Sequence, residues 1–220
     1  MFTGRERHYR RVGQSAWRCT ASAMLAAGLE TPRTVLDLPC GHGRVLRVLC
    51  RALPQAEFTA CDIDRDGVDF CREEFGAIPV YSDADLERVE FATKFDLIWC
   101  GSLVTHLDKA GWLATFRLFI RSLRPGGVAV VTFHGRWVEH LLRQGADYGL
   151  SRAQIDTVLD GHARTGFGYA DYRDGGGYGV SLSSPAWVLA AIAPWPELRV
   201  VALAERQWDD HQDVLAVQRL

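Results

Sequence analysis

The sequence predicts an α/β fold, in which helices cover both faces of a mostly parallel seven-stranded sheet with an antiparallel last strand. Short apolar runs alternate with helical patterns between residues 34 and 133, and this alternation is typical of a three-layer sandwich around a parallel sheet. Two later apolar runs, residues 198–204 and 213–220, are separated by a short polar stretch and indicate an antiparallel pair.

The composition favours a single domain whose substrate is not a nucleic acid. The 220 residues are 48% hydrophobic and 24% charged, which is enough apolar material for a sizeable core. The net charge is −2 and no basic run exceeds the pair Arg10–Arg11, whereas nucleic-acid binders usually carry a strongly basic face. The six cysteines form no Cys-x-x-Cys pair, so we expect no metal site and mostly small, buried, reduced side chains.

Hydropathy predicts a cytoplasmic protein. Residues 1–13 lack the apolar core of a signal peptide. No stretch approaches the ~18 apolar residues that a membrane span requires, so we expect no membrane insertion.

The first expected elements are a helix over residues 15–28 and a strand over residues 34–38. Ser15 can cap the helix, alanine and leucine fill it, and Gly28 can end it. This helix belongs to an expected N-terminal helical cap, residues 1–30. The strand is nearly all apolar, as expected where both faces of a sheet are covered.

The next helix is expected over residues 43–53, which have a helical apolar period. Arg44, Arg47 and Arg51 lie on the opposite side of this helix, and Pro54 ends it. Strands at 57–63, 79–82 and 95–100 follow, and the first two are separated by a helix over residues 66–76.

The second half of the chain begins with a strongly apolar helix at residues 109–123. A Pro-Gly-Gly turn at residues 125–127 leads from it into a fifth strand at 128–133. Residues 145–184 are rich in glycine and tyrosine and precede the closing pair of strands. A segment this long inside a compact domain is usually a lid or a binding insert, so we expect a lid or substrate insert here.

The stretch after the first strand indicates a site for a positively charged ligand. Gly41 and Gly43 open a helix directly after a strand, where glycines allow a tight turn and close approach of a ligand to the backbone. A dinucleotide-binding fingerprint needs a third glycine where Leu46 stands. Asp37 would be badly placed beside a pyrophosphate and suits a cation, although it could also cap the turn.

Residues 35–43, VLDLPCGHG, resemble the first motif of the class I S-adenosylmethionine-dependent methyltransferases. S-adenosylmethionine has no phosphate and carries an ammonium and a sulfonium group. The resemblance extends over residues 34–134 and implies a Rossmann-like fold, with S-adenosylmethionine as cofactor and S-adenosylhomocysteine as product. It also implies that Asp37, Pro39, Gly41 and Gly43 contact the cofactor.

Later motifs imply the remaining cofactor contacts. Asp62 ends the second strand, where the family's acidic residue binds both ribose hydroxyls, and Ile63 would cover one face of the adenine. Asp83 and Ala84 resemble the third motif, in which the carboxylate accepts a hydrogen bond from the adenine amino group. Asp85 competes with Asp83 for this role.

The fourth motif implies both a cofactor contact and an acceptor class. The Cys100 carbonyl and Gly101 would lie near the methionine end of the cofactor. The branch of the family that methylates adenine and cytosine amino groups carries an Asn/Asp-Pro-Pro-aromatic motif, and residues 100–103 read Cys-Gly-Ser-Leu. A small-molecule acceptor is therefore favoured, with oxygen ahead of nitrogen or carbon.

Three histidines follow strands at the edge of the sheet where ligands bind. His106 and His134 are the candidate catalytic bases, with His106 preferred because it closely follows the cofactor motif. His211, with Trp137 and Tyr178, is expected to bind the acceptor. Each of these side chains could instead serve only in packing.

Two alternatives remain open at this point. The domain could bind S-adenosylmethionine as a regulatory module without transferring methyl. It could also be a nicotinamide-dependent oxidoreductase, although the missing third glycine argues against this class.

Overall fold

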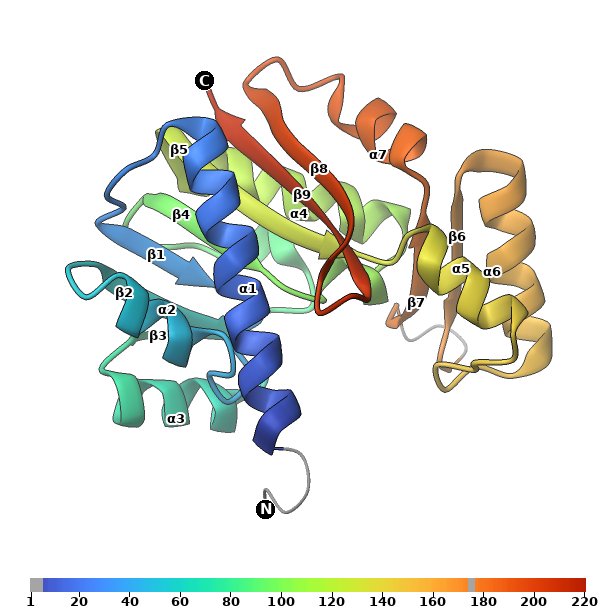
Figure 1. Cartoon of the computed structure of the whole chain (residues 1–220), viewed down its shortest axis with the longest axis horizontal. Coiled ribbons are helices and arrows are strands. Elements are labelled where there is room, and N and C mark those ends of the chain that lie inside the picture. The colour runs from blue at the N-terminus through green and yellow to red at the C-terminus, as the bar shows by residue number, and fades with distance from the viewer. Residues whose placement is uncertain (1–5, 174–176) are drawn as a thin grey trace.

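The computed structural model describes residues 6–173 and 177–220, and it contains the expected seven-stranded sheet (Figure 1). The strand order is β3-β2-β1-β4-β5-β9-β8. The strands are β1 Thr34–Asp37, β2 Glu57–Asp62, β3 Ile78–Tyr81, β4 Phe95–Cys100, β5 Leu123–Phe133, β8 Leu198–Trp208 and β9 Gln212–Arg219. Strand β9 runs antiparallel to both β5 and β8, while the first five strands pair in parallel, which confirms the predicted sheet.

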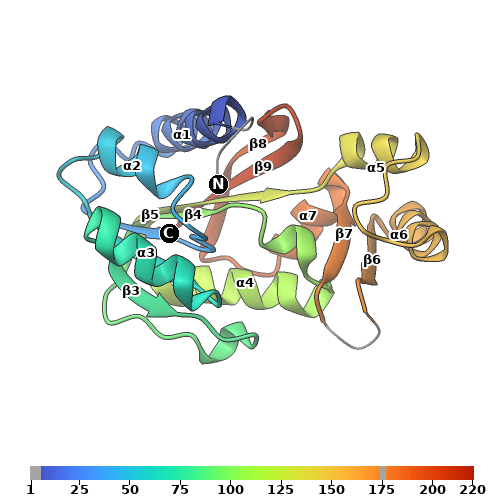
Figure 2. The ribbon, with the colours of Figure 1, turned by 90° about the horizontal axis from the view of Figure 1, so that it is seen from below.

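Helices cover both faces of this sheet, so the three-layer sandwich is also confirmed (Figure 2). The helices are α1 Glu6–Ala27, α2 Leu46–Ala52 and α3 Arg65–Phe75 on one face, and α4 Lys109–Ser122 and α7 Pro185–Ile192 on the other. The alternation of side chains along β1 separates the two cores: Val35 packs with the first group of helices and Leu36 with the second.

A second, smaller unit lies beyond the end of β5, to one side of the main sheet (Figure 1). Its elements are α5 Arg136–Arg143, α6 Arg152–Thr165, β6 Phe167–Asp171 and β7 Gly179–Ser183, and the two strands form an antiparallel hairpin. Nine buried residues of this unit, among them Val138, Val158 and Leu182, form a separate apolar cluster. We call it the hairpin unit.

Residues 145–184, expected as a lid or substrate insert, supply helix α6 and both strands of the hairpin. Part of the glycine-rich stretch, residues 174–176, lies outside the described residues, as do residues 1–5 of the expected N-terminal cap. A role of this segment as a lid stays a prediction.

Several element boundaries differ from the expectation for local reasons. Helix α1 begins at Glu6, so Ser15 lies inside it and does not cap it; its hydroxyl accepts a hydrogen bond from the Asp209 backbone N–H at 2.8 Å. Helix α2 begins at Leu46 because the glycine turn occupies the preceding residues. The patterns of α5 and α7, eight residues each, were too short to be recognised.

Two further observations concern the described part of the chain. None of its helices combines the length and the apolar character needed to cross a membrane. All six cysteines are free, and all except Cys50 are buried.

Candidate active site

The turn between β1 and α2 leaves an open surface beside its backbone. Gly41 and Gly43 have φ values of 47° and 70°, a left-handed conformation that glycine adopts at low cost. A Cβ at Gly43 would lie 2.4 Å from the ring of Phe75, so α3 packs against this glycine. A Cβ at Gly41 would meet nothing within 4 Å, so a ligand can approach the backbone there.

Asp37 ends β1 just before this turn and is a buried carboxylate without a partner. It is 1% exposed, and neither of its carboxylate oxygens has a hydrogen-bond partner among the described residues. Burial raises the pKa of Asp37 well above its ordinary value, and the neighbouring Cys71 and Asp62 raise it further. Buried polar groups are nearly always bonded, so Asp37 is suited to a ligand that brings a positive charge.

Asp62, at the end of β2, is held against the same turn by two backbone amides. Its Oδ2 accepts from the Gly41 N–H at 2.7 Å, and its Oδ1 accepts from the Asp64 N–H at 3.0 Å. Each oxygen retains lone-pair capacity for a further donor. Ile63, the next residue, is 63% exposed and presents an apolar side chain beside the carboxylate. The fold therefore brings Asp37, Gly41 and Asp62 together as the motif spacing predicted.

Asp83 and Asp85 follow β3 and have different local partners. Asp83 Oδ1 accepts from the Asp85 N–H at 2.8 Å. Asp85 caps the short 3₁₀ helix η1 (Leu86–Arg88) by accepting from the Glu87 N–H at 3.0 Å. Ala84 and Asp85 line a cavity of about 290 Å³ together with residues of α4.

The end of β4 approaches the site through main-chain atoms. Cys100 is buried, and Gly101 follows it at a position where a Cβ would lie 2.6 Å from Nε1 of Trp99. A larger residue at 101 would therefore collide with the indole. Ser102 has a φ of 60°, and its N–H donates to Thr132 Oγ1 at 2.8 Å, so β5 fixes this strained turn.

His106 ends the 3₁₀ helix η2 (Val104–His106), and the hairpin unit fixes its orientation. Its Nδ1 lies 2.8 Å from the Gly179 carbonyl oxygen, and its ring stacks on Tyr178 with 4.7 Å between centroids. A carbonyl only accepts, so Nδ1 carries the proton and, in the neutral ring, Nε2 is the basic nitrogen. Burial lowers the pKa of His106, which favours this neutral form.

His134 and His211 form a second aromatic group with Tyr148. The His134 ring centroid lies 5.4 Å from Tyr148 and 5.9 Å from His211, and the Tyr148 hydroxyl lies 3.2 Å from His211 Nε2. Burial lowers the pKa of His134 to about 3 and also lowers the pKa of His211. His134 is 5% exposed, so it is less accessible to an acceptor than His106.

Comparison with known proteins agrees with this geometry. The sequence model described as a methyltransferase domain matches residues 35–127, which run from β1 to β5 and include the glycine turn, Asp62 and Asp83. Residues 35–127 thus match a methyltransferase domain, and the fold and the order of the motifs agree with those of the class I S-adenosylmethionine-dependent methyltransferases.

Individual relatives are distant and longer than the matched region. A malonyl-[acyl-carrier protein] O-methyltransferase of Anoxybacillus flavithermus is 29% identical over 140 residues, 63% of this chain and 53% of the relative. A fatty-acid O-methyltransferase of Mycolicibacterium smegmatis is 30% identical over 117 residues, 50% of this chain and 40% of the relative. The chain thus spans about half the length of the curated relatives it matches.

A solved structure shows the same fold across nearly the whole chain. An S-adenosylmethionine-dependent methyltransferase from Clostridium acetobutylicum superimposes with a TM-score of 0.65 at 15% identity, covering 94% of this chain and 91% of that chain. The hairpin unit and the closing strands therefore fall within a shared architecture.

Sequence reasoning missed a polar network beside the candidate site. Thr132 Oγ1 donates to Gln212 Oε1 at 2.6 Å, and Gln212 Nε2 donates to Ser102 Oγ at 2.9 Å. The network joins the ends of β4, β5 and β9, and Ser102 and Gln212 line a cavity of about 440 Å³ together with His211. No motif marks these residues, because contacts between strands distant in sequence assemble them.

Two further residues of the expected site have the following surroundings in the structure. Trp137 packs under the guanidinium of Arg206, 3.9 Å from the ring centroid, and stacks on His140. An acceptor contact for Trp137 therefore stays a prediction. Pro39 lies within the turn after Asp37, and the peptide bond that precedes it is cis.

Proposed function

We propose that this chain transfers the methyl group of S-adenosylmethionine to an oxygen atom of a small-molecule acceptor. The observation that carries the proposal is Asp37, a buried carboxylate without a partner beside an open glycine turn. An ammonium group supplies the positive charge that such a carboxylate lacks, whereas a pyrophosphate would repel it.

The residues around Asp37 fit the rest of the cofactor. Asp62 would bind the ribose hydroxyls with the lone pairs that its two amide contacts leave available. Ile63 and Ala84 would flank the adenine, and Asp83 would accept from its amino group because of its place in the motif, since Asp83 and Asp85 each already accept one backbone N–H. The main chain at Cys100 and Gly101 would lie along the methionine part. S-adenosylmethionine, when bound, supplies an electrophilic methyl group.

His106 is proposed to accept the proton that a hydroxyl acceptor loses; a carboxylic acceptor is already ionised near neutral pH and would need no base. The Gly179 carbonyl holds Nδ1 as the donor, so Nε2 is the nitrogen that takes the proton. The aromatic rings of Tyr172 and Tyr178 would exclude water around the acceptor. His134 and His211, which contact Tyr148, are proposed to shape the acceptor pocket rather than to act as the base.

An oxygen acceptor is supported by two relatives, whose names describe O-methyltransferases acting on malonyl-[acyl-carrier protein] and on fatty acids. The net charge of −2 favours an acceptor other than nucleic acid, and we propose a cytoplasmic location. The acceptor itself is therefore proposed to be a small hydroxy or carboxylic compound.

Titration calorimetry with S-adenosylmethionine, S-adenosylhomocysteine and NADH tests the cofactor. The proposal predicts binding of the first two and no binding of NADH; the reverse pattern would identify an oxidoreductase. Incubation with methyl-labelled S-adenosylmethionine and a panel of hydroxy and carboxylic acids then tests transfer. If S-adenosylmethionine binds but no compound of the panel or of a cell extract becomes labelled, the chain would instead be a regulatory module.

A further inference from the structure

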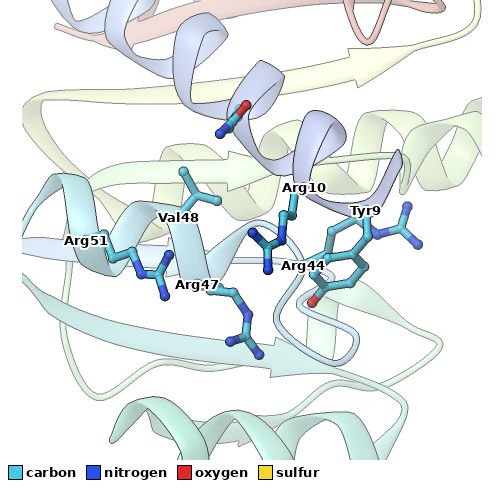
Figure 3. Close-up of a pocket in the computed structure, with 7 residues that line it drawn as sticks. Tyr9, Arg10, Arg44, Arg47, Val48 and Arg51 are labelled. Atoms are coloured by element: carbon cyan, nitrogen blue, oxygen red, sulfur yellow. The ribbon is translucent and has the colours of Figure 1, made fainter. Parts of the chain in front are cut away.

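A basic hollow of about 580 Å³ lies between α1 and α2, outside the residues assigned to the cofactor (Figure 3). Its lining residues are Tyr9, Arg10 and Gln14 of α1 and Arg44, Arg47, Val48 and Arg51 on the α2 side. This lining, which we call the arginine groove, contains four guanidinium groups and, among the described residues, no carboxylate.

Three of these arginines form no ion pair with an acidic residue in the described part of the chain. Arginines elsewhere do, as in Arg117 with Glu87 and Arg136 with Glu205. Arg47 and Arg51 lie four residues apart on α2, Arg44 lies in the turn before this helix, and Arg10 of α1 lines the opposite side of the groove. Arg44, Arg47 and Arg51 carry like charges that repel one another, and a bound anion would relieve this repulsion.

Aromatic rings hold two of the guanidinium groups in fixed positions. The Arg44 guanidinium lies 5.3 Å from the centroid of Tyr9, and that of Arg47 lies 5.0 Å from the centroid of Phe75. Nε of Arg47 is buried and has no hydrogen-bond partner among the described residues. Stacking leaves the in-plane N–H donors of a guanidinium available, so these side chains are pre-organised to donate to an anion.

We propose that the arginine groove binds a phosphorylated small molecule through a diphosphate group. Guanidinium groups bind phosphate oxygens in bidentate fashion, and four of them around one hollow match the several oxygens of a diphosphate better than a single carboxylate. Arg44 also lines the cavity beside Ser102 and His211, so the groove shares one wall with the reaction face. The inference does not depend on methyl transfer.

Calorimetry at low salt with pyrophosphate as the probe tests this site. Wild type is expected to bind, and the double variant Arg47→Gln/Arg51→Gln is expected to raise the dissociation constant by about tenfold or more, because two charge-assisted donors are lost. The control variant Arg164→Gln/Arg199→Gln removes the same charge from exposed arginines outside the groove. It should change the dissociation constant for pyrophosphate by less than about twofold. Binding of S-adenosylhomocysteine should be retained in both variants.

Three outcomes would overturn the proposal. The first is that pyrophosphate does not bind to wild type. The second is that the control variant loses as much affinity for pyrophosphate as the Arg47→Gln/Arg51→Gln variant does. The third is binding of a single-stranded oligonucleotide that is tighter than that of pyrophosphate and falls steeply with salt, since this indicates a nucleic-acid backbone. Arg51→Gln alone, at an exposed position, keeps the test valid if replacement of Arg47 disturbs folding; it should weaken binding by at least about threefold.

Discussion

At the scale of single residues, burial sets the protonation of the two side chains on which the proposed reaction depends. Asp37 is buried without a hydrogen-bond partner among the described residues, and burial raises its pKa, which shifts its titration toward the neutral acid. His106 is half-buried, and its lowered pKa favours the neutral imidazole. Binding of a cationic ligand would favour the ionised form of Asp37. A role as proton acceptor needs the neutral form of His106.

The His106 assignment predicts a particular pH profile for turnover. Since burial lowers the pKa of His106, the rate should rise with pH, and the midpoint of this rise should lie below the ordinary histidine value of about 6.5. His106→Gln should lower kcat by roughly 10²–10⁴-fold and remove this limb, with little change in S-adenosylhomocysteine affinity. Rate measurements between pH 5 and pH 8 check this, with exposed His140→Gln as the control. An unchanged profile in His106→Gln would exclude it as the base.

At the scale of elements, the hairpin unit positions the turn that carries His106. Strand β7 contacts η2 at two points: the Ser181 hydroxyl donates to the Val104 carbonyl at 2.7 Å, and the Gly179 carbonyl accepts from His106. The Ser183 N–H also donates to the His134 carbonyl at 2.9 Å, which ties the hairpin to the end of β5. The acceptor side of the site therefore depends on a unit separate from the sheet that would hold the cofactor.

Loss of one of these contacts should affect turnover more than cofactor binding. Ser181→Ala leaves the buried Val104 carbonyl without this donor and should destabilise the protein by about 1 kcal/mol. We expect lower kcat, because the orientation of His106 loosens, and unchanged S-adenosylhomocysteine affinity. Ser151→Ala, which removes a helix cap in the same unit, is the matched control for stability loss alone. Equal loss of kcat in both variants would contradict a positioning role for Ser181.

The sequence predicted which residues gather beside the glycine turn better than it predicted the surroundings of the histidines, and the reason is physical. Asp37, Gly41 and Asp62 follow successive parallel strands, so spacing along the chain brings them together at one edge of the sheet. His106 was identified by position, but its Gly179 partner comes from a hairpin 73 residues away. The Thr132–Gln212 contact joins residues 80 apart, and no local pattern encodes it.

At the scale of the whole molecule, two apolar cores on opposite sides of one sheet enclose several ionisable groups. Burial lowers the pKa of His106, His134, His162 and His211. A histidine with a lowered pKa binds fewer protons when folded, so its contribution to stability is lost as the pH falls below about 6.5. Asp213, whose pKa burial raises to about 6, acts in the opposite direction.

Among these histidines, His134 should contribute most to the loss of folding stability at low pH. With a folded pKa of about 3, it should account for about 2 kcal/mol of lost stability between pH 7 and pH 5. Because the Asp213 contribution is common to both proteins, the prediction concerns wild type relative to His134→Gln. Urea denaturation at pH 5, 6 and 7 should show a smaller loss of stability on acidification in the variant. Parallel pH dependence in the two proteins would contradict the assignment.

The most direct test of the account is whether cofactor binding releases protons from Asp37. An ammonium group beside the carboxylate lowers its pKa, so calorimetric titration with S-adenosylhomocysteine near neutral pH should release protons, measured in two buffers of different ionisation enthalpy. Asp37→Asn should fold, bind at least about tenfold more weakly and lose this proton release. Absence of binding by wild type, or equal proton release by the variant, would contradict the claim that Asp37 receives the cofactor's positive charge.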